Sequence, residues 1–402
     1  MIYAINERLS SLDEEPPLPF SVSQEKHKES SRPYRFRKQF FTSTTAKQWN
    51  DWNWQLFHRI TTFQQLYRFL TPTEQEQEAL EHPSHHFPFS ITPYYLSLID
   101  LSNPDDPLRK CVIPRSDEMR VTEGEMVDPL SEDQTTPVRG IVHRYPDRAL
   151  FLVTHTCSVY CRYCTRSRLV GGHSDVMGNY WEEAFQYLHQ HKEIRDVIIS
   201  GGDPLMLSDD LIALLLERLK EIKHIEIIRI GTKIPFVLPQ RITPSLIKIL
   251  KRYRPLYINI HATHPNEISE ASRHACNRLS DAGIVLSSQT VLLKGVNDST
   301  ETMTELFHKL LTIRVRPYYL FQCDPIVGSH HFRTTIEKGK EIMEGLRGYT
   351  SGLAIPYYVV DTPLGGGKVP VLPHYEVSHD HSGYHLKNYE GNIYTYPDCK
   401  EG

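Results

Sequence analysis

The sequence predicts an α/β protein whose central sheet consists mainly of parallel strands. From Arg148 onward, short apolar runs alternate with segments of helical periodicity, which is typical of βαβ units. Cysteine, glycine, histidine and aspartate residues follow several of these runs directly. Ligand sites of α/β proteins lie at the carboxyl ends of parallel strands, in barrels as well as in doubly wound sheets. The pattern therefore predicts one site at that edge of the sheet and leaves both architectures open.

Six apolar runs are predicted to be strands, at residues 149–154, 196–200, 225–231, 256–262, 284–293 and 316–322. Their continuous Val, Ile and Leu content favours strands that are buried on both faces. Helices are predicted between them and after the last run, at residues 180–191, 208–221, 243–252, 266–282, 299–312 and 334–349.

The rest of the chain divides by composition. Residues 1–44 are rich in Pro, Ser and charge and are expected to form a polar, extended arm. Residues 45–140 form a mainly helical region in which Trp49, Trp52, Trp54 and Phe57 are expected to anchor short helices to a core. Residues 141–360 contain the strand–helix core, and residues 361–402 form a separate C-terminal segment.

Composition argues against several function classes. The net charge of −4 and the pI near 6.6 give no reason to expect nucleic acid as a partner. No apolar run approaches the roughly 18–20 residues that cross a bilayer, and no signal peptide is recognisable at the N-terminus. Four of the seven cysteines are scattered, at Cys111, Cys276, Cys323 and Cys399, which argues against a disulfide framework. A cytoplasmic location is expected.

The other three cysteines, Cys157, Cys161 and Cys164, follow the first predicted strand in "HTCSVYCRYCTRSR". Their thiolates could hold a metal centre. A structural zinc would need a fourth protein ligand, such as a distant histidine, and an electron-transfer cluster normally has four cysteines. A [4Fe–4S] cluster with three cysteine ligands leaves one iron open to a small molecule. A set of cysteines without metal is the remaining interpretation.

This Cys-x3-Cys-x2-Cys pattern, with Tyr163 before the last cysteine, resembles the radical S-adenosylmethionine superfamily. The resemblance implies that the open iron binds S-adenosylmethionine and that the bound molecule is cleaved to a 5′-deoxyadenosyl radical. The stretch "ISGGDPL" resembles the glycine-rich strand end that holds the methionine part. The implied contacts with S-adenosylmethionine come from Gly201, Gly202, Asp203, His261 and Gln289.

A second informative stretch is "VVDTPLGGGKVPVLP", at residues 359–373. It is not a phosphate-binding P-loop, because Thr362 replaces the first glycine, Val369 follows the lysine, and Pro370 excludes a helix. Lys368 on a glycine turn could form an imine with an aldehyde cofactor, or it could be an ordinary surface lysine.

From about Thr45 the chain resembles the lysine 2,3-aminomutase family, on motifs that include "WNDWNWQLFHRITT", "HRYPDRALFLVT", "CSVYCRYCTRSR", "EGLRGYTSGLAIPYYVVD" and "LGGGKVP". The resemblance implies a radical S-adenosylmethionine partial (β/α)6 barrel with an N-terminal helical extension and a short C-terminal segment that carries the pyridoxal 5′-phosphate (PLP) lysine. Lys368 would hold PLP, Arg144 and Arg148 would bind its phosphate, and Arg166 would bind the substrate carboxylate.

The same resemblance implies the substrate. Asp324 and Asp361 match positions that surround the ε-ammonium group in the lysine-selective members, so the implied reaction converts L-lysine to β-lysine, with an amino acid as the small-molecule partner. Arginine or glutamate as substrate, a role in supplying β-lysine for elongation factor P, and a non-catalytic iron–sulfur protein are the alternatives. A reducing partner such as flavodoxin or ferredoxin is implied. Because only Cys399 lies near the C-terminus, we expect no zinc site, and a homo-oligomer is left open.

Overall fold

The computed structural model describes residues 31–81, 88–171 and 180–399, and the chain divides into two compact units, residues 1–45 and 46–402. In the first unit, helix α3 (Arg32–Phe40) occupies part of the segment that was expected to be extended, so that expectation is wrong for these residues. The helix begins after Ser31 with a proline in its first turn, which favours helix initiation, and the Phe36 ring lies 4.9 Å from the Phe40 ring. Residues 1–30 of the expected arm lie outside the described residues. The expected divisions near residues 140 and 360 stay predictions.

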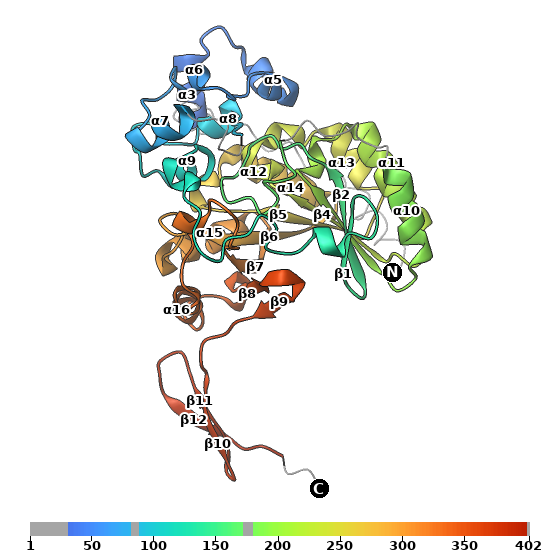
Figure 1. The fold of residues 1–402 in the computed structure, drawn as a ribbon, viewed down its shortest axis with the longest axis vertical. Coiled ribbons are helices and arrows are strands. Elements are labelled where there is room, and N and C mark those ends of the chain that lie inside the picture. The colour runs from blue at the N-terminus through green and yellow to red at the C-terminus, as the bar shows by residue number, and fades with distance from the viewer. Residues whose placement is uncertain (1–30, 82–87, 172–179, 400–402) are drawn as a thin grey trace, which may run out of the picture. The chain divides into compact units, whose positions relative to one another are not determined.

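The second unit contains a sheet of nine strands in the order β1 to β9 (Figure 1). The strands are β1 (Ile141–Tyr145), β2 (Arg148–Thr154), β3 (Asp196–Gly201), β4 (Ile227–Thr232), β5 (Leu256–His261), β6 (Val285–Leu292), β7 (Arg316–Gln322), β8 (Tyr357–Thr362) and β9 (Gly367–Pro370). Strands β2 to β8 are parallel, and β1 and β9 pair antiparallel at the two edges. The six predicted strands are confirmed as β2 to β7, while β1, β8 and β9 were not predicted.

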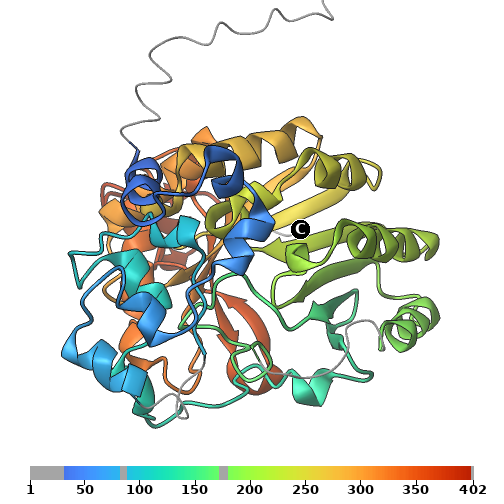
Figure 2. The ribbon, with the colours of Figure 1, turned by 90° about the horizontal axis from the view of Figure 1, so that it is seen from above.

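The sheet curves until its two edge strands meet. The backbone N–H of Lys368, in β9, donates a hydrogen bond of 2.8 Å to the hydroxyl of Tyr145, at the end of β1. Because β1 and β9 stand at opposite ends of the strand order, this contact requires a nearly closed barrel and excludes an open doubly wound sheet (Figure 2).

The predicted helices of the core are confirmed, with slightly shorter bounds. They are α10 (Trp181–Gln190), α11 (Asp209–Glu221), α13 (Pro244–Leu250), α14 (Glu270–Asp281), α15 (Thr300–Thr312) and α16 (Ile336–Leu346), with a short α12 (Ile234–Val237). In α11 the Ser208 hydroxyl caps the first turn by accepting from the N–H of Leu211. Its buried residues, Ile212, Leu215, Leu216 and Leu219, recur at helical spacing and face the sheet, which explains why the periodicity located this helix.

Residues 46–140 form short helices, namely α4 (Ala46–Trp49), α5 (Trp52–Phe57), α6 (Phe63–Leu66), α7 (Glu74–Glu81), α8 (Pro93–Leu96) and α9 (Pro107–Val112). Trp49 is buried, as expected for an anchor, but Phe57 is 87% exposed and was wrongly predicted to be one. Gln55 is the buried residue of α5, where it accepts a hydrogen bond from the N–H of Tyr94 and donates one to the carbonyl of Trp49.

A second sheet, which was not predicted, lies near the C-terminus and contains β10 (Glu376–Asp380), β11 (Gly383–Lys387) and β12 (Ile393–Tyr396) in antiparallel order. An ion pair of 2.9 Å joins Lys387 to Glu344 of α16. None of the described helices combines the length and the apolar character that crossing a bilayer requires.

Candidate active site

Most of the predicted site residues lie at the carboxyl edge of the barrel, whereas Arg148 begins β2 and Arg144 lies in the antiparallel β1 beside it. The cysteine loop leaves β2, Gly201 ends β3, His261 ends β5 and Gln289 lies opposite it in β6. On the other side of the barrel, Asp324 follows β7, Asp361 lies near the end of β8, and Lys368 lies in β9 in register with Asp361. The backbone thus places side chains from distant parts of the sequence around one opening.

The two glycines that end β3 allow the cysteine loop to lie directly against the backbone. A Cβ atom on Gly201 would stand 2.2 Å from the carbonyl oxygen of Thr154, and one on Gly202 would stand 2.4 Å from that of Thr156. The N–H of Gly202 donates to the Thr154 carbonyl at 2.6 Å, and the N–H of Asp203 donates to the Thr156 carbonyl at 2.9 Å. Gly201 has a φ of +128°, which also favours glycine. The sequence "GGD" therefore fixes the start of the cysteine loop.

The three cysteines of the loop are partly buried and have free thiols. Burial raises the pKa of Cys157, Cys161 and Cys164, that of Cys164 to about 11. A metal ion binds the thiolate form, so binding a cluster would release the protons of these thiols. The three thiols lie on one loop, at spacings of four and three residues, and together offer three sulfur ligands to a cluster.

A buried polar network supports the loop from behind. The hydroxyl of Tyr163 lies 2.8 Å from Thr263 Oγ1 and 2.9 Å from His261 Nε2, and the two rings stack with centroids 5.6 Å apart. Burial, together with the nearby ammonium of Lys233, holds the pKa of His261 well below its usual value, so this imidazole is neutral at pH 7. Lys233 in turn forms a buried ion pair of 2.6 Å with Glu267.

The Asp203 carboxylate is hydrogen-bonded within the protein. Its carboxylate accepts hydrogen bonds from the hydroxyl of Thr232 at 2.6 Å, from the N–H of Lys233 at 2.8 Å and from the N–H of Leu205 at 3.1 Å. It therefore links the ends of β3 and β4. A contact of this stretch with S-adenosylmethionine, which stays a prediction, would come from the backbone beside Asp203 more readily than from its carboxylate.

Two aspartates and one lysine form the other half of the site. Lys368 Nζ lies 3.1 Å from Asp361 Oδ1 and 5.4 Å from the centre of the Phe321 ring. Asp324 accepts a hydrogen bond of 3.0 Å from the hydroxyl of Thr165. Burial, with the neighbouring charge of Asp361, raises the pKa of Asp324 to about 7. Lys368 thus pairs with Asp361, while Asp324 has no ion-pair partner among the described residues, so the two carboxylates are short of positive charge.

The three predicted arginines have different surroundings. Arg166 binds Glu132 through Nε and Nη2, with a shortest distance of 2.6 Å. The Arg148 guanidinium lies 3.9 Å from the centre of the Tyr145 ring. Arg144 donates to the Leu130 carbonyl, while its buried Nε has no hydrogen-bond partner within the described part of the chain. An unpaired buried N–H is costly, so Arg144 suits an external oxygen such as one of a phosphate.

Several residues of the site were not singled out from the sequence. Thr165 and Tyr145 lie beside predicted site residues, in "CTRSR" and "HRYPDR", and adjacency was the available signal. Glu132 lies in a proline-rich stretch without periodicity, and nothing in its local sequence indicates that it reaches Arg166.

The chain is similar in sequence to several known proteins. A family model described as radical SAM superfamily matches residues 151–307, and one described as lysine-2,3-aminomutase matches residues 343–402. The L-lysine 2,3-aminomutase of Acetoanaerobium sticklandii is 48% identical over 90% of this chain and 88% of its own length. That of Clostridium subterminale is 48% identical over 90% of this chain and 87% of its own length. The glutamate 2,3-aminomutase of Clostridioides difficile is 43% identical over 88% of this chain and 84% of its own length.

Proposed function

Because this chain belongs to the lysine 2,3-aminomutase family of the radical S-adenosylmethionine superfamily, we propose that it is an isomerase that moves the α-amino group of L-lysine to the β-carbon. Its cofactors are a [4Fe–4S] cluster, S-adenosylmethionine and PLP. The cluster and S-adenosylmethionine supply radical hydrogen abstraction when bound, and PLP supplies a π-system across which an amino group can migrate between neighbouring carbons.

The cofactors are assigned to the residues whose surroundings fit them. Cys157, Cys161 and Cys164 would hold the cluster, and the close contact of Gly201 and Gly202 with the backbone of Thr154 and Thr156 fixes the start of their loop. Lys368 would carry PLP, since its amine lies at the barrel opening and its backbone is fixed by Tyr145. Arg144 has an unsatisfied Nε, and together with Arg148 it would bind the phosphate.

The observation that carries the choice of substrate is the shortage of positive charge at Asp324 and Asp361. In this structure the cation beside them is Lys368, which pairs with Asp361. When Lys368 holds PLP, its amine would no longer be a free cation beside Asp361, and both carboxylates would favour an external cation. The ε-ammonium of lysine supplies it, and each charge-assisted hydrogen bond formed there is worth about 1.5–3 kcal/mol.

Two further residues orient this pocket. The Thr165 hydroxyl holds one oxygen of Asp324 and leaves the other available for the substrate ammonium. Glu132 occupies the Nε and Nη2 donors of Arg166, so the Nη1 donors of the guanidinium would be left for the substrate carboxylate. Lysine would thus be held at both ends, with its α- and β-carbons fixed between them.

The glutamate alternative is disfavoured by the same residues. A γ-carboxylate placed between Asp324 and Asp361 would bring a third negative charge into a pocket where the pKa of Asp324 is already raised to about 7. Arginine, which is cationic, is compatible with the charges and differs from lysine in size.

The proposal extends to a cytoplasmic location and to a low-potential reductant such as flavodoxin or ferredoxin, because cluster chemistry needs an electron and reduced thiols.

The test is a substrate panel. Anaerobically prepared protein with cluster and PLP is reduced in the presence of S-adenosylmethionine and offered L-lysine, L-arginine or L-glutamate at equal concentration. We expect β-lysine as the main product by chromatography. A faster conversion of glutamate or arginine would refute the assignment of the pocket to lysine.

A further inference from the structure

We propose that His143, His191 and Glu193 form a binding site for one divalent transition-metal ion, separate from the cysteine loop. His143 lies in β1, His191 caps the C-terminus of α10, and Glu193 lies in the turn that leads to β3. One ligand atom of each of the three side chains lies within 4.8 Å of those of the other two. The proposed reaction assigns no role to these three side chains.

The arrangement of the two imidazoles fits metal coordination. The rings have centroids 5.8 Å apart and are nearly perpendicular, at 78°, so their nitrogens can converge without the rings stacking. His143 Nδ1 lies 2.8 Å from the Tyr187 hydroxyl, which leaves Nε2 as its metal-binding nitrogen. Metal-ligating histidines commonly use their second nitrogen in such an outer hydrogen bond, which fixes the orientation of the ring.

Glu193 provides the third donor. Its Oε1 lies 2.8 Å from His191 Nδ1, so the carboxylate already points at the imidazole with which it would share an ion. The Tyr187 ring stacks on His191 with centroids 3.9 Å apart, and it therefore contacts both histidines. About half of the Glu193 side chain and a third of the His191 side chain are exposed, so an ion can enter from solvent.

The donor set selects the class of ion. Two imidazoles and one carboxylate suit Zn²⁺, Co²⁺, Ni²⁺ or Cu²⁺, whereas Mg²⁺ and Ca²⁺ prefer all-oxygen sites. The three protein ligands leave the remaining positions to water. A bound ion would tie edge strand β1 to the α10–β3 connection, and β1 also carries Arg144 and Tyr145 of the candidate active site.

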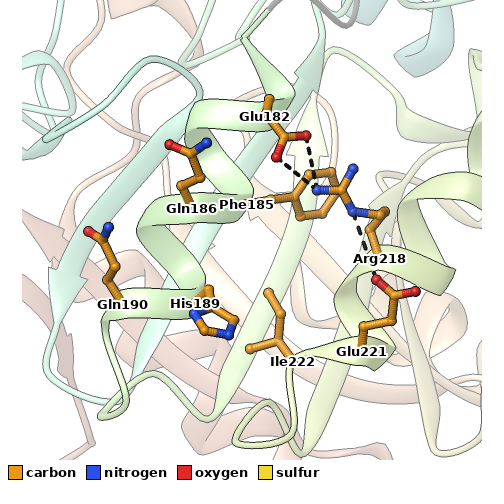
Figure 3. Close-up of a pocket in the computed structure, with 8 residues that line it drawn as sticks. All are labelled: Glu182, Phe185, Gln186, His189, Gln190, Arg218, Glu221 and Ile222. Atoms are coloured by element: carbon orange, nitrogen blue, oxygen red, sulfur yellow. Dashed lines mark hydrogen bonds and ion pairs between the residues drawn. The ribbon is translucent and has the colours of Figure 1, made fainter.

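Zinc titration of the tag-free, cluster-loaded protein by calorimetry tests the site. We expect one tight Zn²⁺ per chain, which His143→Gln and His191→Gln each abolish. His189→Gln is the matched control, because His189 lies two residues before His191 but faces the groove of about 380 Å³ between α10 and α11 (Figure 3). The Zn²⁺ affinity of this variant should equal that of the unmodified protein. Tyr187→Phe should weaken binding about tenfold.

Cobalt distinguishes this site from thiols. Co²⁺ bound here should give d–d bands without a thiolate charge-transfer band, because no sulfur belongs to the ligand set. Absence of Zn²⁺ binding, binding that survives His191→Gln, or a thiolate charge-transfer band that disappears only when Cys399 is replaced would each overturn the proposal. None of these results depends on aminomutase activity, so they leave the proposed function untouched.

Discussion

At the scale of single residues, Asp324 is the group whose surroundings are most informative. Its carboxyl has a pKa of about 7 because it is buried beside Asp361. Substrate ammonium binds the ionised form, so binding should improve as pH rises through 7. Between pH 6 and pH 8 the ionised fraction of such a carboxyl increases about tenfold. We therefore expect kcat/KM for lysine to rise about tenfold more over this range in the unmodified protein than in Asp324→Asn. The titration of lysine itself affects both proteins equally. Parallel pH profiles would show that Asp324 is not the ammonium partner.

The same replacement should raise KM for lysine by roughly tenfold to a hundredfold at pH 8, the cost of one charge-assisted hydrogen bond. Iron and sulfide content should be unchanged, since the Asp324 carboxylate is hydrogen-bonded to Thr165 and is not one of the expected cluster ligands. Asp105→Asn is a suitable control, because that aspartate is exposed and pairs with Lys110. A KM equal to that of the control would refute the pocket.

Asp324 should also affect stability in a pH-dependent direction. Its folded-state pKa lies above the ordinary value, so the folded protein binds the proton more tightly than the unfolded chain, and stability is lost as pH rises from about 4 to 7. Without lysine present, Asp324→Asn should therefore increase the free energy of unfolding at pH 8 by about 1–3 kcal/mol, which is measured as a higher thermal midpoint. At pH 4 the variant and the unmodified protein should have nearly the same midpoint. A lower midpoint for the variant at pH 8 would contradict the raised pKa.

The candidate ligand and cofactor-binding residues could be found from the sequence, whereas the residues that hold them in place could not. Three cysteines at short spacing and a lysine after three glycines are recognisable in the amino-acid sequence alone. Glu132 and Thr165 are ordinary residues whose importance depends on what folding brings beside them, namely Arg166 and Asp324. Asp203 is recognisable in "GGD", yet its hydrogen bonds to Thr232 and Lys233 appear only in three dimensions.

At the scale of elements, the junction between β3 and the cysteine loop makes a direct prediction. Gly201→Ala would place a Cβ atom 2.2 Å from the Thr154 carbonyl and should displace the loop, with loss of most of the bound iron. Gly231→Ala is the matched control at the end of β4, where a Cβ atom would meet nothing closer than 3.8 Å. The test is the iron content of the two variants after identical anaerobic reconstitution. Equal iron content in both would mean that the close backbone contact at Gly201 is not required.

The strands show where sequence periodicity works. Strands β2 to β7 are apolar runs followed by helices and were located within two residues. Strand β1 contains His143, Arg144 and Tyr145, and its pairing with β2 shifts register between Val142 and Tyr145, so it has no regular alternation. Strands β9 to β12 are short, β10 and β12 are exposed along their whole length, and none of the four has the apolar pattern of a buried strand. Pairing with a neighbour, and not local propensity, defines them as strands.

At the scale of the whole molecule, the helices before the barrel support the cysteine loop. Arg162 of the loop forms an ion pair of 2.5 Å with Glu118 and donates its backbone N–H to the carbonyl of Cys111, directly after which α9 ends. Helix α9 is fixed to α7 by the fully buried Arg109–Glu76 pair, at 2.6 Å. The N-terminal helical region therefore contributes to the site through packing, although it holds none of the predicted ligands.

Breaking that pair should be costly. Arg109→Met leaves the Glu76 carboxylate buried without its partner and should reduce the free energy of unfolding by about 3–5 kcal/mol. The double variant with Glu76→Met should recover much of the loss, because neither charge is then left alone. Chemical denaturation of the three proteins measures this. A single variant as stable as the unmodified protein would show that these helices are not coupled through Arg109.

The central claim is that a cofactor-bearing lysine faces a pocket for a cationic amino acid, and reductive trapping tests it most directly. PLP-loaded protein is treated with borohydride and digested, and the labelled peptide is identified by mass spectrometry, with and without competing amino acids. We predict that the label is on Lys368 and that L-lysine suppresses it far more than equal L-glutamate. A label on another lysine, or equal suppression by glutamate, would contradict the account.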